Sequence, residues 1–186
     1  MISFKERIRQ LVIIWLLRGL KQPWSYQLMH AFNRVLPMIG VEAVIFRYNK
    51  GVLEILLTRR DKDDPNWPGM WHVSGTTQRN DDVKYHADTD ANFYVALERI
   101  WKSELKLSDE EIGLIRAEKC DIISWRHSRG ACVSTIFACW FDKVINFSEG
   151  EFFPVDALPE DFLEGQQVVV SAAVRYVKQQ CNAKNA

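Results

Sequence analysis

Two strand-like segments joined by a short turn constrain the fold of this chain more than any other feature. The segments "VEAVIFRY" (41–48) and "VLEILLTRR" (52–60) are rich in Val, Ile, Leu and Phe, as half-buried strands are. The "NKG" between them predicts a hairpin turn. Three further strands are predicted along the chain, in "MWHVSG", "CDIISWRH" and "ACVSTIFACWFDKV".

Helical segments are interspersed with these strands. The segment "ANFYVALERIWKSELKL" (91–107) follows the third strand, with Asp90 as its candidate N-cap. The last predicted helix is "PEDFLEGQQVVVSAAVRYVKQQ" (159–180), with an expected break near Gly165. This order predicts an α+β or α/β domain over residues 41–186, with a mixed β-sheet sandwiched between helices.

Residues 1–40 are predicted to form an N-terminal helical hairpin that extends this domain. Its apolar run "LVIIWLL" (11–17) is shorter than the roughly 20 residues of a membrane-spanning helix, so no membrane span is expected. Because the run is apolar on all sides, we expect burial against the domain or against a second copy, as in a homodimer. The alternative is a basic amphipathic helix on a membrane or an anionic partner, since residues 1–38 hold six basic residues and one acidic residue.

Charge and cysteine content bound the partners and the compartment. The chain carries 24 basic and 24 acidic residues, so its net charge of zero offers no overall field for nucleic acid. Its four cysteines have no metal-site spacing, and we recognise no secretory signal before them. We therefore expect reduced thiols in a cytoplasmic protein that has no nucleic-acid partner.

A carboxylate stands on the apolar stripe of the helix predicted over residues 91–107. Phe93, Leu97 and Ile100 recur at helical spacing, and the next residue on their stripe is Glu104. Burying a carboxylate is costly unless an Arg, a set of backbone amides or a metal ion meets it. The alternative is that Glu104 lies at the frayed end of the helix and reaches water.

The loop before this helix resembles the start of the Nudix hydrolase signature, G-x5-E-x7-R-E-U-x-E-E-x-G-U, where U is a bulky aliphatic residue. The family usually begins this loop with W-x-x-P-G-G. In "WHVSGT", Trp71 and Gly75 match, while Ser74 and Thr76 replace the Pro and the second Gly. Asp82 stands where the signature has its first Glu.

The spacing after Asp82 departs from the signature. Sixteen residues separate Asp82 from Arg99, the signature Arg, where the family has seven. The extra residues are polar, and we expect residues 83–90 to form a mobile excursion near the mouth of a pocket.

The helix completes the resemblance in part. In "RIWKSELKL", Arg99, Glu104 and Leu107 match the signature, whereas Ile100, Ser103 and Lys106 do not. Only one of the family's three helix carboxylates is therefore present. GDP-mannose mannosyl hydrolases, one branch of the family, are similar in keeping only the Arg and the last Glu. Together with the strand order, the resemblance spans residues 41–177.

The resemblance implies a metal-dependent hydrolase. Nudix enzymes hydrolyse a nucleoside diphosphate linked to another group, with Mg²⁺ or Mn²⁺ on the phosphates. Glu104, Asp82 and the backbone carbonyl of Gly75 would be the metal ligands here. Mg²⁺ often uses one or two carboxylates together with substrate phosphates, so a reduced site of this kind is still compatible with metal binding.

Other site residues follow from the same resemblance. Arg60, Gly75 and Thr76 would contact the substrate. Arg99 and Glu104 would be catalytic, with Arg99 orienting the helix carboxylate. The general base is left open between His127 and a loop carboxylate, namely Glu149, Glu151 or Glu164. The GDP-mannose branch uses a His as its base, but His127 does not stand at the equivalent place, so only the reduced metal site is carried over.

Two functions remain open at this point. The first is a metal-dependent hydrolase of a nucleoside diphosphate derivative or a related phosphorylated small molecule. The second is a Nudix-fold ligand-binding or regulatory module that has lost catalysis. The loss of two carboxylates favours the module, and an inward Glu104 favours the hydrolase.

Overall fold

The computed structural model describes residues 6, 8, 26–33, 36–83, 89–127, 130–141, 145 and 147–184. The run "LVIIWLL" and residues 84–88 of the predicted excursion lie outside these residues, so their predictions stay open. No helix within the described ranges is long and apolar enough to cross a membrane.

The strands are β1 (Met38–Asn49), β2 (Val52–Arg59), β3 (Trp71–His72), β4 (Ser74–Thr77), β5 (Ile115–His127), β6 (Gly130–Phe141) and β7 (Glu151–Pro154). The α-helices are α2 (Tyr26–Asn33), α3 (Thr89–Ser103), α4 (Asp109–Ile112) and α5 (Gln167–Lys184). Two short 3₁₀ helices are η1 (Asn80–Asp82) and η2 (Glu164–Gln166).

The described strands form one mixed sheet, as the sequence predicts. Its main order is β3-β2-β1-β6-β5, with β4 paired to β1 and β7 paired to β2. β1 and β6 are parallel, and the other pairs are antiparallel. Along one edge of β1, residues 40–43 pair with β4 and residues 46–49 pair with β2. β4 and β2 therefore follow one another on the same side of β1.

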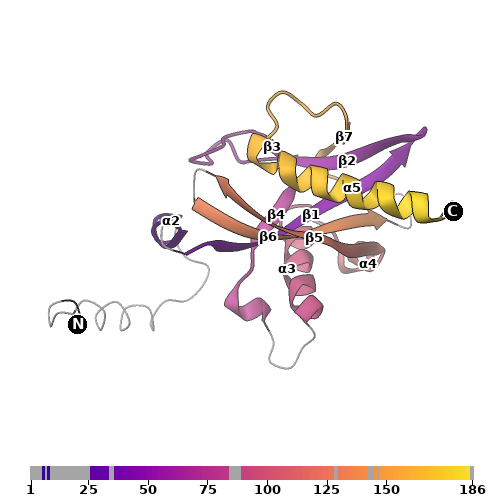
Figure 1. Ribbon diagram of the computed structural model, residues 1–186. Helices are drawn as coiled ribbons and strands as arrows, with labels where there is room; N and C mark the ends of the chain where they lie inside the picture. Colours follow the sequence, from indigo (N-terminus) through magenta and orange to yellow (C-terminus); the bar gives the residue numbers. More distant parts are fainter. Residues whose placement is uncertain are drawn as a thin grey trace.

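Helices cover both faces of the sheet (Figure 1). Side chains of β1 alternate between the two faces, because successive residues of a strand point in opposite directions. Val41 and Ile45 pack toward α3, whereas Val44 and Phe46 pack toward α5. The apolar patterns of β1 and of the two helices thus build two cores, one on each side of the sheet.

The strand predicted over "MWHVSG" is interrupted at Val73. Trp71 and His72 pair with β2, whereas Ser74 begins the pairing with β1. The chain changes its partner strand within these few residues, and Val73 itself is fully buried. This exchange brings the residues before and after Val73 to the junction of β2, β3 and β4.

The helix predicted over residues 91–107 begins at Thr89 and ends at Ser103. Asp90 therefore lies inside its first turn and is not the N-cap. Lys106 has a left-handed backbone with φ 57°, and the Leu107 amide then donates to the Trp101 carbonyl at 3.1 Å. The signature has Gly at position 106, which tolerates this conformation better than Lys. Glu104 is consequently in a turn after α3 rather than on the helix.

The structure differs from the prediction at α4 and at the start of α5. α4 is not predicted from the sequence, although Ser108 and Glu111 form a reciprocal capping box at its start. The helix predicted from residue 159 with a break near Gly165 does not form over residues 159–163, and Gly165 lies in η2, directly before α5. The last α-helix therefore begins at Gln167, later than predicted.

Candidate functional site

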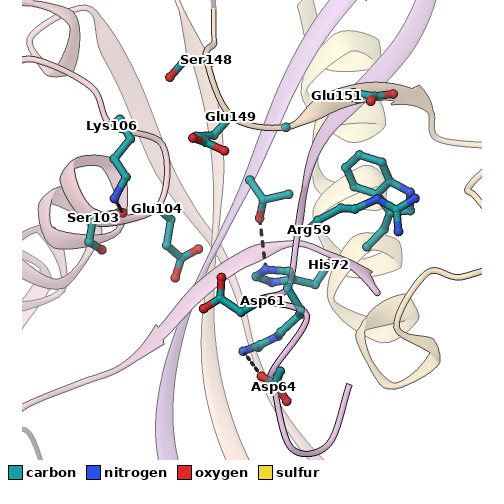
Figure 2. A pocket seen from close by; sticks show the side chains of 14 residues that line it. Arg59, Asp61, Asp64, His72, Ser103, Glu104, Lys106, Ser148, Glu149 and Glu151 are labelled. Atoms are coloured by element: carbon teal, nitrogen blue, oxygen red, sulfur yellow. Dashed lines mark hydrogen bonds and ion pairs between the residues drawn. The ribbon is translucent and has the colours of Figure 1, made fainter. Parts of the chain in front are cut away.

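A cleft of about 620 Å³ lies where the end of β2, the strand β3, the turn after α3 and residues 148–151 meet. Both acidic and basic side chains line it. Figure 2 shows the carboxylates of Asp61, Glu104 and Glu149 pointing into this space. The cleft thus brings together side chains from segments that are far apart in the sequence.

Glu104 is the most perturbed acid of this cleft. The pKa of its carboxyl is raised to about 7, chiefly by burial and also by the negative charge of Glu42. The charge of Arg60 and hydrogen bonds from Ser74 and the Gly75 backbone lower this pKa in part. Its Oε2 atom is buried and has no hydrogen-bond partner within the described part of the chain. The inward carboxylate predicted from the helical stripe is therefore present.

The folding stability of the cation-free protein should fall as the pH rises toward 8. Glu104 has a pKa of about 7 in the folded chain against an ordinary value of 4.5, so the folded state holds its proton more tightly. This stabilisation is complete below pH 4.5 and is lost as the pH rises through about 7, on the order of 3 kcal/mol in all. Urea unfolding at pH 5 and pH 8 measures it. Glu104→Gln should remove this dependence, and an identical pH profile in both proteins would contradict the assignment.

Glu42 is a buried carboxylate that the sequence analysis does not single out. It lies opposite Gly75 in the pairing of β1 with β4, and a side chain at position 75 would overlap its carboxylate. Ser134 donates to its Oε1 at 3.2 Å, and Gln166 donates to its Oε2 at 3.3 Å. A larger residue at position 75 would therefore have to displace the Glu42 side chain. The available signal was a lone acid inside the apolar run "VEAVIF".

Gln166 connects the segment before α5 to the chain at Val73 through hydrogen bonds. Its Oε1 accepts from the Val73 amide at 2.8 Å, and its Nε2 donates to the Val73 carbonyl at 3.2 Å. The same Nε2 also donates to Glu42. One side-chain amide therefore satisfies the backbone of the residue at which the strand is interrupted.

Arg99 pairs with Asp82 and with the loop. It donates to Asp82 Oδ2 at 2.6 Å, to Thr76 Oγ1 at 2.7 Å and to the Thr77 carbonyl at 3.3 Å. Asp82 Oδ2 also accepts from the Arg79 amide at 2.7 Å. Neither Arg99 nor Asp82 lines the cleft. The structure brings these signature residues together as a clamp on the loop, and their predicted roles in catalysis and metal binding stay predictions.

Replacing Asp82 by Asn should destabilise the protein without changing its affinity for cations. The ion pair with Arg99 is mostly buried, so losing its charge should cost about 2 kcal/mol of unfolding free energy. Chemical denaturation measures that cost, with the exposed neighbour in Asp81→Asn as control. A fall in Mn²⁺ affinity at unchanged stability would instead assign Asp82 to the metal.

Arg60 is predicted to contact the substrate, and its surroundings suit that role better than those of Arg59. Its Nη1 donates to Asp64 at 3.3 Å, while its buried Nε has no hydrogen-bond partner within the described ranges. It lines the same cleft as Glu104. Arg59, in contrast, pairs with Asp161 at 2.8 Å and lies over the Trp71 ring.

Only some of the candidate general bases line the cleft. Glu149 and Glu151 line the cleft, whereas Glu164 belongs to η2 and does not. Gly150 between the first two has φ 92°, and a Cβ there would lie 2.6 Å from the Leu57 carbonyl oxygen. His127 is the last residue of β5, the strand at the sheet edge opposite β3; its side chain lies outside the described residues.

A row of buried polar side chains also reaches the cleft and was not predicted. His72 Nδ1 lies 2.8 Å from the Val73 carbonyl oxygen. Since a carbonyl oxygen can only accept a hydrogen bond, Nδ1 is the donor. Its Nε2 lies 3.2 Å from Thr58 Oγ1, which in turn lies 3.5 Å from Ser74 Oγ. The dashed line at His72 in Figure 2 marks this hydrogen bond, whose partner is Thr58.

Solved structures with the same fold are known. The Nudix domain of Shewanella oneidensis NrtR, complexed with ADP ribose, is 16% identical with a TM-score of 0.51, over 82% of this chain and 94% of that chain. A mutT/nudix family protein from Listeria innocua is 18% identical with a TM-score of 0.54, over 80% and 99% of the two chains. The C. elegans Ap4A hydrolase binary complex is 12% identical with a TM-score of 0.53, over 76% and 98%.

Comparison by sequence gives no such match. No family model matches the chain, and no curated protein matches it. The likeness therefore lies in the arrangement of the strands and helices, at identities of 12–18% for the three structures named above. On that evidence the chain has the Nudix fold, a mixed sheet between helices, as its degenerate signature predicts.

Proposed function

We propose that this chain is a Nudix-type hydrolase that cleaves a nucleoside diphosphate derivative with the help of a divalent cation. The observation that carries the proposal is Glu104 Oε2, which is buried at the cleft without a hydrogen-bond partner among the residues described. An unsatisfied buried carboxylate oxygen is costly, and a cation would satisfy it.

The carboxylate of Glu104 at the cleft suits Mg²⁺ or Mn²⁺. The resemblance to the family would add the backbone carbonyl of Gly75, and both groups are hard ligands of the kind that these ions prefer. A cation bound there would neutralise charge on the diphosphate. In the described chain, no group of three His, Cys, Asp or Glu side chains is placed to hold a metal ion. We therefore propose that the diphosphate itself contributes further ligands, as in the reduced site of the GDP-mannose branch.

Arg60 would hold a phosphate at the same cleft. Its Nε is a buried donor without a partner among the described residues, just as Glu104 Oε2 is an acceptor without one. Guanidinium groups bind phosphate oxygens well, because they present several donors in one plane. A buried donor and a buried acceptor that lack partners, on two residues of one cleft, are compatible with a ligand that carries both a cation and anionic oxygens.

Glu149 is the general base that the proposal favours. Its carboxylate points into the cleft, together with that of Glu104 (Figure 2). In the proposed reaction Glu149 takes a proton from a water molecule while the oxygen of that water bonds to one phosphorus of the diphosphate. The bond between that phosphorus and the oxygen of the leaving group breaks, and the leaving oxygen takes a proton from solvent. Arg60 holds the diphosphate in place during this step.

A ligand-binding or regulatory module without catalysis is the second candidate. Ile100, which stands where the signature has a carboxylate, is fully buried in the core under α3. That position therefore serves packing. The Nudix domain of NrtR was solved with ADP ribose, which supports a nucleotide-type ligand for a domain of this fold. A module of this kind would bind its ligand with an affinity that ignores both Mg²⁺ and the charge of Glu104.

A product-release screen tests the proposal. The chain is assayed with nucleotide sugars, dinucleotides and nucleoside triphosphates, in Mg²⁺, in Mn²⁺ and in a chelator. We expect release from at least one substrate class, dependent on the cation and lost in Glu104→Gln. Release that persists with the chelator would refute the cation dependence. Ligand binding without release, equal with and without chelator, would support the binding module instead.

A further inference from the structure

We infer that Lys106 is a diphosphate-binding residue, which places an ammonium group on the substrate phosphates at the side of the cleft next to Glu104. The inference rests on the proposed function, because it names a further contact between this chain and the proposed substrate. Lys106 lines the cleft together with Ser103 and Glu104. Figure 2 shows the three side chains together, at the end of α3 and in the turn after it.

The backbone of Lys106 has a conformation that favours glycine. Its φ is 57°, and the next amide, that of Leu107, donates to the Trp101 carbonyl. This is a common way for a helix to end, and Gly usually takes the left-handed position in it. A lysine costs stability there relative to glycine, because its Cβ crowds the backbone. The turn itself would therefore be better formed by the residue that Lys106 replaces.

The contacts of Lys106 leave its charge available to a ligand. Its Nζ donates to the Ser103 carbonyl at 2.5 Å, and the side chain is exposed. Among the described residues it forms no ion pair. The other two basic side chains of the cleft each pair with a carboxylate, Arg59 with Asp161 and Arg60 with Asp64. The alternative role for Lys106 is to stabilise the last carbonyls of α3, as lysines at helix ends do.

The charge balance of the cleft favours the ligand role. Within the described chain, three basic side chains line it against five carboxylates, namely Asp61, Asp64, Glu104, Glu149 and Glu151. These carboxylates would repel a diphosphate. A cation at Glu104 and the guanidinium of Arg60 would offset part of that repulsion. Lys106 would offset more, because its flexible stem carries three donors that can turn from a carbonyl to a phosphate oxygen.

Ser103 keeps the ammonium of Lys106 from being neutralised within the chain. It stands where the signature has a carboxylate, and residues three apart on a helical turn are neighbours. An acid at position 103 could pair with Lys106, as Glu98 pairs with Lys102 at 2.8 Å on the exposed side of α3. Ser103 offers only its carbonyl. The two departures from the signature therefore act together: one removes a competing carboxylate, and the other supplies a positive charge.

The test follows the binding of methylenediphosphonate in Mg²⁺ by titration calorimetry. Lys106→Gln keeps a donor for the Ser103 carbonyl and removes the charge, so we expect about tenfold weaker binding, the lower end for a hydrogen bond to a charged group. Lys106→Arg keeps the charge and should bind within about threefold of the wild type. Wild-type affinity in Lys106→Gln would overturn the inference, and so would equal losses in Lys106→Gln and Lys106→Arg.

A pair of glycine variants separates binding from stability. Lys50 is the matched control, because it also has a left-handed backbone, with φ 49°, and does not line the cleft. Lys106→Gly and Lys50→Gly should each raise the melting temperature by about 2–4 °C, since glycine relieves the backbone. Only Lys106→Gly should also bind methylenediphosphonate about tenfold more weakly. Unchanged affinity in Lys106→Gly would leave Lys106 as a helix-end residue and overturn the inference.

Glu104→Gln and a chelator separate this inference from the proposed function. If Mg²⁺ strengthens binding only when Glu104 is present, while the Lys106 variants bind like the wild type, the inference fails and the cation site stands. If binding ignores both Mg²⁺ and Glu104→Gln but weakens in Lys106→Gln, the cation site is rejected and Lys106 is still a diphosphate contact. A wild type that does not bind methylenediphosphonate in Mg²⁺ would reject both.

Discussion

Replacing Glu104 by Gln is expected to lower cation-dependent turnover by more than about 10²-fold, since even outer partners of a metal ligand are worth 10- to 100-fold. Gln keeps the shape of the side chain and removes the charge that the buried Oε2 would direct at a cation. The same change should raise stability at pH 8 without a cation by about 1–3 kcal/mol, because it removes a buried charge that its surroundings compensate only in part. Turnover and urea unfolding of the same two preparations measure both effects.

Glu98→Gln is the matched control for this experiment. Glu98 lies on α3, which ends just before Glu104, and it is exposed and pairs with Lys102 at 2.8 Å. A surface pair of this kind contributes little, so both turnover and stability should remain within experimental error. Equal turnover in Glu104→Gln and Glu98→Gln would show that Glu104 has no part in the reaction. Equal ligand affinities in all proteins, with and without chelator, would mean that the loop at Gly75 no longer serves a metal site.

The sequence predicts the hairpin of β1 and β2 because the local pattern of apolar and turn residues determines it. The "NKG" turn is present, with Lys50 at φ 49° and Gly51 at φ 83°, and it joins β1 and β2 in the predicted hairpin. The interruption at Val73 could not be predicted in the same way. Whether a strand changes its partner depends on neighbours distant in the sequence, and the apolar pattern of "MWHV" looks the same in both cases.

The candidate site likewise contains residues that a local sequence pattern predicts and residues that it does not. Glu104 is predicted because its neighbours on one helical stripe are apolar, which is a local signal. Glu42 and Thr58 lie on strands whose contact with the loop at Gly75 depends on sheet register. Such contacts have no local signature, since a buried Thr in a strand is ordinary. Degenerate signature positions were informative for a different reason: Ile100 marks packing, and Lys106 takes the left-handed turn that the family gives to Gly.

Glu149→Gln should lower kcat by about 10²–10⁴-fold, the usual contribution of a general base, with little change in KM. The split follows from the proposed role, because Glu149 would accept a proton from water and would not hold the diphosphate. Its position depends on Gly150, whose φ of 92° and close approach to the Leu57 carbonyl leave no room for a side chain. Steady-state kinetics with the best substrate of the screen measure both parameters.

Two comparisons decide whether Glu149 itself carries the proton. Glu151→Gln changes the acid at the start of β7, which also lines the cleft, and Glu164→Gln changes one that does not. If Glu149 is the base, both should keep kcat within about threefold of the wild type, because losing a nearby charge without a proton-transfer role costs well under 1 kcal/mol. Gly150→Ala should reduce kcat as Glu149→Gln does, since it must displace the loop from Leu57. A large loss in Glu151→Gln with normal rates in Glu149→Gln would move the role of the base by two residues along the chain.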